Sequence, residues 1–288
     1  MQGGDNVGVM PQKRAASLPK DAPAVVKAAL DIDRGFDVVV HAGASGVKPN
    51  EQDAVGLVDG NVGVTAAIID AVGQQKKKPR LLFTSSSAVY GPVEGAHRSR
   101  EDDDLRPANV YGAAKVAAEV VGAAVAAKAG VPFVVLRLFG VYGPREAKHR
   151  MVPYLARALA DGARPSLTPG AQQRDWIYVA DVAAAVVAAI SIDAGVYNVC
   201  SGVPVAVRDV ARAVGRVVFA ADAADAADLD VRVGLGARPY RSDEPMFVVG
   251  DPGRFSAATG WRPTTPLEVG IAATVRWALA HRSVENAP

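Results

Sequence analysis

The sequence predicts an α/β fold in which helices cover a doubly wound parallel sheet. Short apolar runs rich in Val, Leu and Phe alternate along the chain with longer stretches rich in Ala and Val. That alternation is typical of successive strand and helix units that build a parallel sheet. The chain has 288 residues and 50% hydrophobic content, so it can form one large domain and a smaller second one.

The predicted strands are short apolar runs that end at glycine, serine or another polar residue. In chain order they cover 36–41, 81–87, 131–138, 176–179 and 196–200. The segment 139–144 contains two glycines and a proline, so we expect a turn there that closes the third strand.

The predicted helices are longer stretches rich in alanine, valine or leucine. In chain order they cover about 23–30, 57–72, 111–125, 151–159 and 181–190. Asp181 is the predicted N-cap of the last helix, because a carboxylate accepts hydrogen bonds from the free amides of a first turn. We interpret the locally simple segment 220–225 as the surface of a helix or loop.

Charge and cysteine content exclude several classes of function. The net charge is +2, so we expect no broad positive surface for nucleic acid or an anionic membrane, and we interpret the basic run 76–80 as a solvated loop. Cys200 is the single cysteine and the four histidines are scattered, so we expect neither an intrachain disulfide nor a metal site. The amino terminus lacks a basic region followed by an apolar stretch, and we see no run of membrane-spanning length. These features favour a cytoplasmic protein.

The most informative local pattern is Tyr111 followed by Lys115 at the start of a predicted helix. A tyrosine is a poor base because its usual pKa is about 10, but an ammonium group one turn away stabilises the phenolate. Ser86 stands at the carboxyl end of a predicted strand, where it faces the crevice of an open α/β sheet. The three residues together suit proton transfer to or from a substrate hydroxyl. On its own, the same spacing is also that of an ordinary surface pair on a helix.

Several blocks of sequence follow one another in order from Asp37 to the carboxyl terminus. They are Val39–Ala44, Ser85–Gly91, Tyr111 with Lys115, Leu136–Pro144, Arg174–Val182, Tyr197–Gly202, Gly250–Phe255 and Gly260–Pro263. In this order they resemble the extended short-chain dehydrogenase/reductase superfamily, in its NAD-dependent epimerase/dehydratase branch acting on nucleotide sugars. The resemblance implies a Rossmann-like sheet, with its amino-terminal strands missing, and a smaller carboxyl-terminal substrate-binding domain.

The resemblance also implies how the chain divides into domains. Residues 1–144 would form a partial dinucleotide-binding domain that carries the catalytic residues. Residues 145–288 would form mainly the substrate-binding region, with 174–202 returning to the Rossmann-like sheet.

Individual residues receive roles from the same resemblance. The implied catalytic residues are Ser86, Tyr111 and Lys115. The implied residues for NAD, with NADP left open, are His41, Ala42, Gly43, Ser85, Tyr111, Lys115 and Phe139. The implied residues for a nucleotide-sugar substrate are Ser86, Ser87, Asn61, Gly140, Arg174 and Arg241. A guanidinium group suits the pyrophosphate because it makes bidentate contacts with phosphate oxygens.

Three of these assignments have alternatives in the sequence. Asn61 is also suited to capping a helix. Arg174 stands next to Asp175, which is consistent with a structural ion pair. Arg238 competes with Arg241 for the role at the phosphates.

Among the reactions of the resembled family, we favour an epimerase, which oxidises a ring carbon to a ketone and returns hydride to the opposite face. A ketoreductase that uses the same residues once is the close alternative. A non-catalytic remnant that serves as a binding or scaffold subunit is the rival from another class. Ser87 and Ala88 occupy places where the family's 4,6-dehydratases carry an acidic pair, which argues against dehydration. Gly140 stands where an asparagine is frequent in the family.

The glycine-rich cofactor turn of the resembled family has no counterpart near the start of this sequence. Gly3 and Gly4 follow no predicted strand, and the glycines at 56, 60 and 63 lie outside any strand-to-helix turn. The strand at 36–41 would then lie at an uncovered edge of the sheet. We therefore expect an amino-terminally truncated or mis-started member of the family, which binds a dinucleotide weakly or not at all. Tight binding of NAD or NADP in calorimetry would contradict this expectation.

The resemblance finally implies a homodimer. Helices 57–72 and 111–128 would pack against the same helices of a second copy as a four-helix bundle. Val120, Val121 and Val125 would supply part of the apolar face. Sedimentation of the purified protein tests this prediction.

Overall fold

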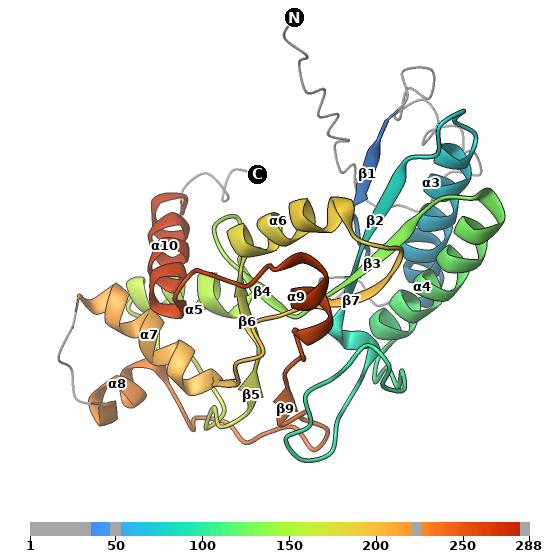
Figure 1. Cartoon of the computed structure of the whole chain (residues 1–288). Coiled ribbons are helices and arrows are strands. Elements are labelled where there is room, and N and C mark those ends of the chain that lie inside the picture. Colours follow the sequence, from blue (N-terminus) through green and yellow to red (C-terminus); the bar gives the residue numbers. More distant parts are fainter. Residues whose placement is uncertain (1–35, 47–52, 221–225, 283–288) are drawn as a thin grey trace, which may run out of the picture. The chain divides into compact units, whose positions relative to one another are not determined.

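The computed structural model describes residues 36–46, 53–220 and 226–282 (Figure 1). These residues form two compact units. The first contains the described residues up to Gly91, with Asp103–Arg137 and Ala189–Tyr197. The second contains Pro92–Asp102, Leu138–Ala188 and the described residues from Asn198 onward. The domain division predicted at residue 144 stays a prediction.

A four-stranded sheet forms the centre of the first unit (Figure 1). Its strands, in spatial order, are β1 (Val38–His41), β2 (Arg80–Ser86), β3 (Phe133–Leu138) and β7 (Gly195–Val199). Strands β1 and β2 are parallel, with Val38 opposite Arg80 and His41 opposite Phe83. The predicted α/β fold with a Rossmann-like parallel sheet is confirmed. Among the described strands β1 is at the end of the order, and Val40 is 46% exposed there.

Two long helical segments pack side by side on this sheet (Figure 1). The first runs through α2 (Ala54–Val58), the π-helical segment η2 (Asp59–Gly63) and α3 (Val64–Gly73), and the second is α4 (Val110–Ala129). Ile69 and Val72 of α3 and Ala118 of α4 share a buried apolar cluster with Leu81 and Phe83 of β2. The predicted helices at 57–72 and 111–125 are therefore present and are longer than predicted.

These two helical segments also correct one expectation from the sequence. Ala54–Gly73 and Val110–Ala129 each have 20 residues, with mean hydropathies of 1.5 and 1.4. The expectation that no run reaches membrane-spanning length is therefore wrong by length and composition. Both segments contribute to the buried cluster on the sheet, and core helices of globular proteins pass the same test. Their composition is weak support for a membrane span.

Two small groups of strands belong to the second unit. Strands β4 (Gly140–Tyr142) and β6 (Trp176–Tyr178) are parallel, and β8 (Val205–Ala206), β5 (Gln173–Arg174) and β9 (Phe247–Val248) form a three-stranded sheet. The turn predicted at 139–144 is therefore wrong, since it contains β4. Gly140 permits this pairing because a Cβ atom there would lie 2.3 Å from the Asp175 carbonyl oxygen.

The core of the second unit lies between helices (Figure 1). These are α5 (Met151–Ala160), α7 (Val207–Phe219), α8 (Ala226–Val233) and α10 (Leu267–Ala280). Leu155, Val214, Leu229 and Ile271 from these four helices are all fully buried in one apolar cluster. The predicted helix at 151–159 is confirmed as α5.

Asp181 does not cap its helix, contrary to the prediction. Helix α6 (Val179–Ala188) begins two residues earlier, so Asp181 lies inside its first turn. Its carboxylate instead accepts hydrogen bonds from the Thr264 and Thr265 backbone amides at 3.0 and 3.2 Å. The short helix α9 (Gly253–Thr259) precedes these threonines, and two 3₁₀ turns, η3 (Ser87–Val89) and η4 (Ala189–Ser191), belong to the first unit.

Three predictions fall where the structure gives no description. They are the helix at about 23–30, most of the segment 220–225, and the absence of a glycine-rich turn before Asp37. These lie outside the described residues.

Candidate active site

Tyr111 lies in the first turn of α4, in the first unit. The side chain of Asn109 caps this turn by accepting a hydrogen bond from the Gly112 amide at 2.8 Å. Tyr111 is half-buried, and Lys115 follows it one turn later on the same face of the helix. The capped first turn therefore sets the direction in which both side chains leave the helix.

Lys115 is buried beneath that face, with only 1% of its surface exposed. Its Nζ atom donates a hydrogen bond to the Thr84 carbonyl oxygen of β2 at 2.7 Å. The same nitrogen lies 4.1 Å from the centre of the Phe83 ring. A buried ammonium loses the stabilisation that its water shell would give. The carbonyl oxygen and the aromatic face replace part of that stabilisation.

Burial makes the charge on Lys115 easier to remove. It lowers the pKa of Lys115 from 10.5 to about 8, although the nearby carboxylate of Glu119 acts in the opposite direction. The group is therefore still an ammonium ion at neutral pH. It sits within one or two pH units of its titration, which is where a proton-transfer site operates best.

The last two serines of β2 and the serine that follows them differ in their surroundings. Ser86 is the last residue of β2, is half-buried, and accepts a hydrogen bond on its hydroxyl from the Ala88 amide at 3.2 Å. Ser87 is half-buried and opens the turn η3. Ser85 is buried, and its hydroxyl donates a hydrogen bond to the carboxylate of Glu119. Ser85 therefore points into the protein, whereas Ser86 stands at the strand end where the sequence predicts it.

Helix α4 approaches the turn after β2 very closely at Gly112. A Cβ atom there would lie 2.5 Å from the Ala88 carbonyl oxygen. A glycine is therefore needed for the first turn of α4 to pack against η3. This contact holds the helix that carries Tyr111 against the turn that follows Ser86.

The end of β1 and the loop after it contain three of the residues predicted to contact the cofactor. His41 is buried, and its Nε2 lies 3.1 Å from the hydroxyl of Thr65. Burial lowers the pKa of His41 to about 4, with a further contribution from the charge of Lys115, so the ring is neutral at physiological pH. Ala42 is exposed and Gly43 is half-buried. The imidazole thus anchors the loop, and the next two residues face outward.

Asn61 fastens the same loop from the π-helical segment η2. The side chain is 1% exposed, and its Oδ1 accepts a hydrogen bond from the Ser45 amide at 3.3 Å. Its Nδ2 donates to the carbonyl oxygens of Ser45 and Leu57 at 3.2 and 2.9 Å. The amide is thus bonded at both ends, and Asn61 lies inside the helical segment and does not cap it.

Two predicted residues of the second unit lie at the start of β4. Phe139 is 2% exposed, and its amide donates to the Val199 carbonyl oxygen at 3.3 Å. A Cβ atom at Gly250 would lie 2.7 Å from the Phe139 ring, so the ring is tightly enclosed. Gly140 pairs with Trp176 through the backbone.

Arg174 and Arg241 come together at a third residue of the second unit. Arg174 Nη2 lies 3.0 Å from Oε1 of Glu244, and Arg241 Nε lies 3.2 Å from Oε2 of the same carboxylate. Burial lowers the pKa of Arg174, and the charge of Arg241 adds to the effect, whereas Glu244 opposes it. The structure therefore brings together the two arginines predicted to grip phosphate.

Asp175 is not the partner of Arg174. Its buried carboxylate accepts hydrogen bonds from the Ser201 amide and hydroxyl at 2.7 and 2.8 Å, and from the Gly202 amide at 2.9 Å. Burial raises the pKa of Asp175, although these hydrogen bonds lower it. The alternative of an ion pair between Arg174 and Asp175 is therefore wrong.

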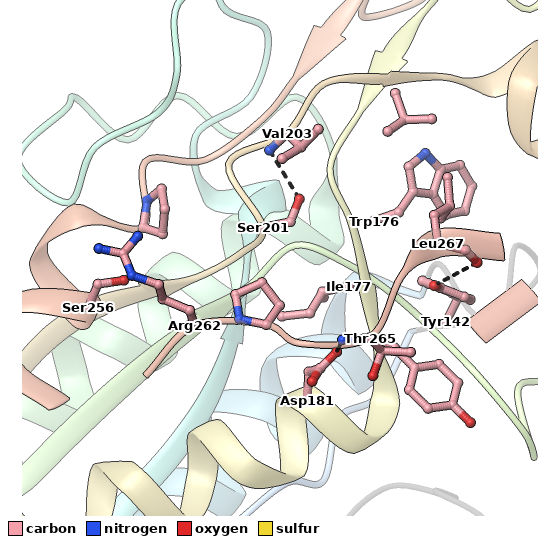
Figure 2. Close-up of a pocket in the computed structure, with 14 residues that line it drawn as sticks. Tyr142, Trp176, Ile177, Asp181, Ser201, Val203, Ser256, Arg262, Thr265 and Leu267 are labelled. Carbon is pink, nitrogen blue, oxygen red and sulfur yellow. Dashed lines mark hydrogen bonds between the residues drawn. The ribbon is translucent and has the colours of Figure 1, made fainter. Parts of the chain in front are cut away.

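A pocket of about 360 Å³ also lies in the second unit, between β4, β6, the start of α10 and the loops near Ser201 and Arg262 (Figure 2). Figure 2 shows hydrogen bonds from the Thr265 amide to Asp181 and from the Val203 amide to Ser201. These polar groups therefore already have partners within the protein. None of the residues with a predicted catalytic or binding role lines this pocket.

Three residues that contact or adjoin predicted site residues within their own units were not predicted from the sequence. Gly112 and Glu119 are in the first unit, and Glu244 is in the second. The spacing of four residues from Lys115 to Glu119 is a signal that a helix would place both on one face. Glu244 follows Arg241 by three residues but had no comparable signal.

Comparisons with known proteins show the family and the fold to which this chain is similar. A model of the NAD dependent epimerase/dehydratase family matches residues 17–200. The dTDP-glucose 4,6-dehydratase of Streptomyces griseus is 31% identical over 258 residues, which cover 86% of this chain and 74% of that protein. The UDP-glucose 4-epimerase of Streptomyces lividans is 29% identical over 254 residues, which cover 80% of this chain and 71% of that protein.

Two solved structures are similar in fold as well as in sequence. The UDP-glucose 4-epimerase of Thermus thermophilus, in complex with NAD, has a TM-score of 0.76 and 28% identity, over 89% of this chain and 82% of that one. MoeE5 in complex with UDP-glucuronic acid and NAD has a TM-score of 0.75 and 27% identity, over 88% of this chain and 82% of that one.

Proposed function

Because the chain belongs to the NAD-dependent epimerase/dehydratase family, we propose that it is an NAD-dependent nucleotide-sugar epimerase. The observation that carries this proposal is the burial of Lys115. Lys115, one helical turn after Tyr111, is 1% exposed, and its amine donates a hydrogen bond to the Thr84 carbonyl oxygen of β2. An ordinary surface pair would leave the lysine in water, so this arrangement supports a catalytic role.

The residues at the ends of β1 and β2 fit a dinucleotide. Both strands are parallel, so their carboxyl ends meet at one edge, which is where open α/β sheets bind ligands. The loop after His41 is held from below by Asn61, which leaves Ala42 and Gly43 to face a cofactor. Lys115 supplies a cation beside this loop. When bound, NAD supplies an acceptor and donor of hydride.

The proton chemistry then follows from three side chains of the first unit. Tyr111, as a phenolate, accepts the proton of a sugar hydroxyl while the hydrogen on the same carbon leaves as hydride. Lys115 keeps a positive charge near the phenolate, and the hydroxyl of Ser86 donates to the substrate oxygen. In the return step Tyr111 gives the proton back to the oxygen. The complete cycle therefore changes the configuration of the carbon with no net gain or loss of protons or electrons.

The positions of Arg174 and Arg241 support a substrate that is bound through its nucleoside diphosphate group. The two guanidinium groups meet at the carboxylate of Glu244, and Arg241 Nε also lies 3.9 Å from Asp243. Their remaining N–H groups suit phosphate oxygens. The nucleotide would bind through these groups of the second unit.

Product analysis separates the epimerase from its alternatives. Purified protein is incubated with UDP- and GDP-sugars and NAD or NADPH, and the sugars are identified by NMR. An epimer formed with catalytic NAD is the expected result. Loss of NADPH equal to product would instead establish the ketoreductase, and a 4-keto-6-deoxy sugar would establish a dehydratase. No turnover with bound cofactor and substrate would favour the scaffold alternative.

We also propose that the protein is a cytoplasmic homodimer. Val120 and Val121 on α4 are 62% and 38% exposed, and Val55 and Val58 on α2 are 69% and 47% exposed. Exposed valines on two helices of one unit support a four-helix bundle between two copies. A monomer in sedimentation at micromolar concentration would overturn this proposal.

A further inference from the structure

Four buried polar side chains of the first unit form a network that no step of the proposed reaction uses. Glu119 is 6% exposed, Arg137 and Tyr90 are 4% exposed, and Ser85 is 5% exposed. Burying a charged pair removes the solvation of both ions, and an apolar pair of similar volume is often no less stable. A contribution to stability is therefore not a sufficient reason for this network.

The carboxylate of Glu119 is the centre of this network. It accepts hydrogen bonds from Arg137, with Nε 3.2 Å from both carboxylate oxygens and Nη2 2.7 Å from Oε2. It also accepts a hydrogen bond from the hydroxyl of Ser85. Arg137 in turn donates from Nη1 to the hydroxyl of Tyr90 at 3.0 Å, and its guanidinium lies 5.0 Å from the centre of that ring.

These partners come from every element that carries the reacting groups. Glu119 follows Lys115 by one turn of α4. Ser85 directly precedes Ser86 at the end of β2, and Tyr90 directly follows the turn η3. Arg137 lies in β3. A single carboxylate thus connects the lysine-bearing turn with both sides of the segment that presents Ser86.

We propose that Glu119 is a positioning residue for this reaction: its carboxylate holds the Lys115 turn of α4 against the ends of β2 and β3, through Ser85 and Arg137. The inference rests on the proposed function for the roles of Ser86, Tyr111 and Lys115. Glu119 itself touches neither substrate nor cofactor in this proposal.

A second consequence concerns the charge of Lys115. The groups that interact with its amine are Glu119 from α4, His41 from β1, and the Thr84 carbonyl and Phe83 ring from β2. His41 is neutral above about pH 4, so Glu119 is the negative charge that opposes the effect of burial. Removing that charge lowers the pKa of Lys115 and reduces the fraction of ammonium at neutral pH.

Two variants separate positioning from simple stability. E119Q removes the charge but leaves Arg137 as an unpaired buried cation, which can unfold the protein. The double variant E119Q/R137M removes both charges and should therefore fold. R212M is the matched control, because it breaks the ion pair of Arg212 with Asp230 in the second unit, at 2.7 Å, and touches none of the catalytic elements.

The experiment measures kcat, KM and the titration of Lys115, whose carbon-13-labelled ε-methylene signal is assigned by K115M. For E119Q/R137M we expect a denaturation midpoint near that of the wild type. We also expect kcat to fall about tenfold with KM within about twofold, and Lys115 to titrate at lower pH. R212M should leave kcat and the Lys115 titration unchanged.

The same measurements on the double variant can also contradict the inference. Wild-type kcat with a wild-type Lys115 titration would show that Glu119 only pairs with Arg137, and would overturn the inference. The titration does not need turnover, so it remains decisive if the wild-type protein epimerises no sugar that is tried. In that case an unchanged titration overturns the inference, and a lowered one supports it although the proposed function has failed.

Discussion

Lys115 is the residue on which the proposed chemistry most depends. Its amine is held between the Thr84 carbonyl oxygen and the Phe83 ring, and burial lowers its pKa to about 8. The spacing from Tyr111 was visible in the sequence because a helix of 3.6 residues per turn makes it a local property. The link from Glu119 to Ser85 was not, because it joins residues that only the packing of α4 on β2 brings together.

Because the ring of buried His41 is neutral, we predict that the free energy of unfolding depends on pH through this residue. Its pKa is about 4 in the folded protein and 6.5 in the unfolded chain, so above pH 6.5 the ring is neutral in both states. As the pH falls from 6.5 to 4, the unfolded chain takes up a proton that the folded protein does not. The free energy of unfolding therefore falls, by roughly 3 kcal/mol from this group.

Urea denaturation at pH 7 and at pH 4 gives the loss of unfolding free energy for the wild type and for each variant, and these losses are compared. H41Q should lose roughly 3 kcal/mol less than the wild type over that range. H149Q, at an exposed histidine, is the control and should behave as the wild type does. Equal losses for H41Q and the wild type would contradict the buried, neutral state of His41.

At the scale of elements, the approach of α4 to the turn η3 organises the candidate site. Gly112 allows the approach, and the Asn109 cap sets the first turn of the helix. The sequence predicted this helix, since a long run of alanine and valine is a local signal. It did not predict β4, because that strand exists through its pairing with β6, and it misplaced Asp181, whose partners are Thr264 and Thr265.

G112A tests the approach of α4 to η3 directly. Alanine is favoured over glycine in a helix by about 1 kcal/mol, so an unobstructed site would gain stability. Here the added Cβ would lie 2.5 Å from the Ala88 carbonyl oxygen, so α4 must move away from η3. We expect a loss of about 1–3 kcal/mol in the free energy of unfolding and a lower kcat.

Denaturant unfolding and steady-state kinetics measure the two effects of G112A. A113S is the matched control, because it adds one heavy atom at the adjacent exposed position. It should change stability by no more than about 0.5 kcal/mol. A G112A protein as stable and as active as the wild type would show that the close approach has no functional importance.

At the scale of the whole molecule, the sequence predicted the fold class because alternation of apolar strands with helices is repeated along the chain. The family resemblance implied that Arg174 and Arg241 both bind the pyrophosphate, which stays a prediction, and the structure shows both arginines paired with Glu244. That carboxylate was missed because its contact with Arg174 spans 70 residues. Long-range polar contacts of this kind depend on the packing of whole elements, which local pattern does not specify.

The central proposal is that Tyr111 moves a proton on a sugar hydroxyl while hydride leaves and returns at the same carbon. An isotope measurement tests it most directly: a nucleotide sugar deuterated at the reacting carbon is converted in ordinary water, and the epimer is analysed by NMR. We predict that the epimer retains its deuterium, because hydride is transferred and not exchanged with solvent. Y111F should slow this conversion at least about 100-fold. An epimer that carries hydrogen from water at that carbon, or a Y111F protein with wild-type kcat, would contradict the proposal.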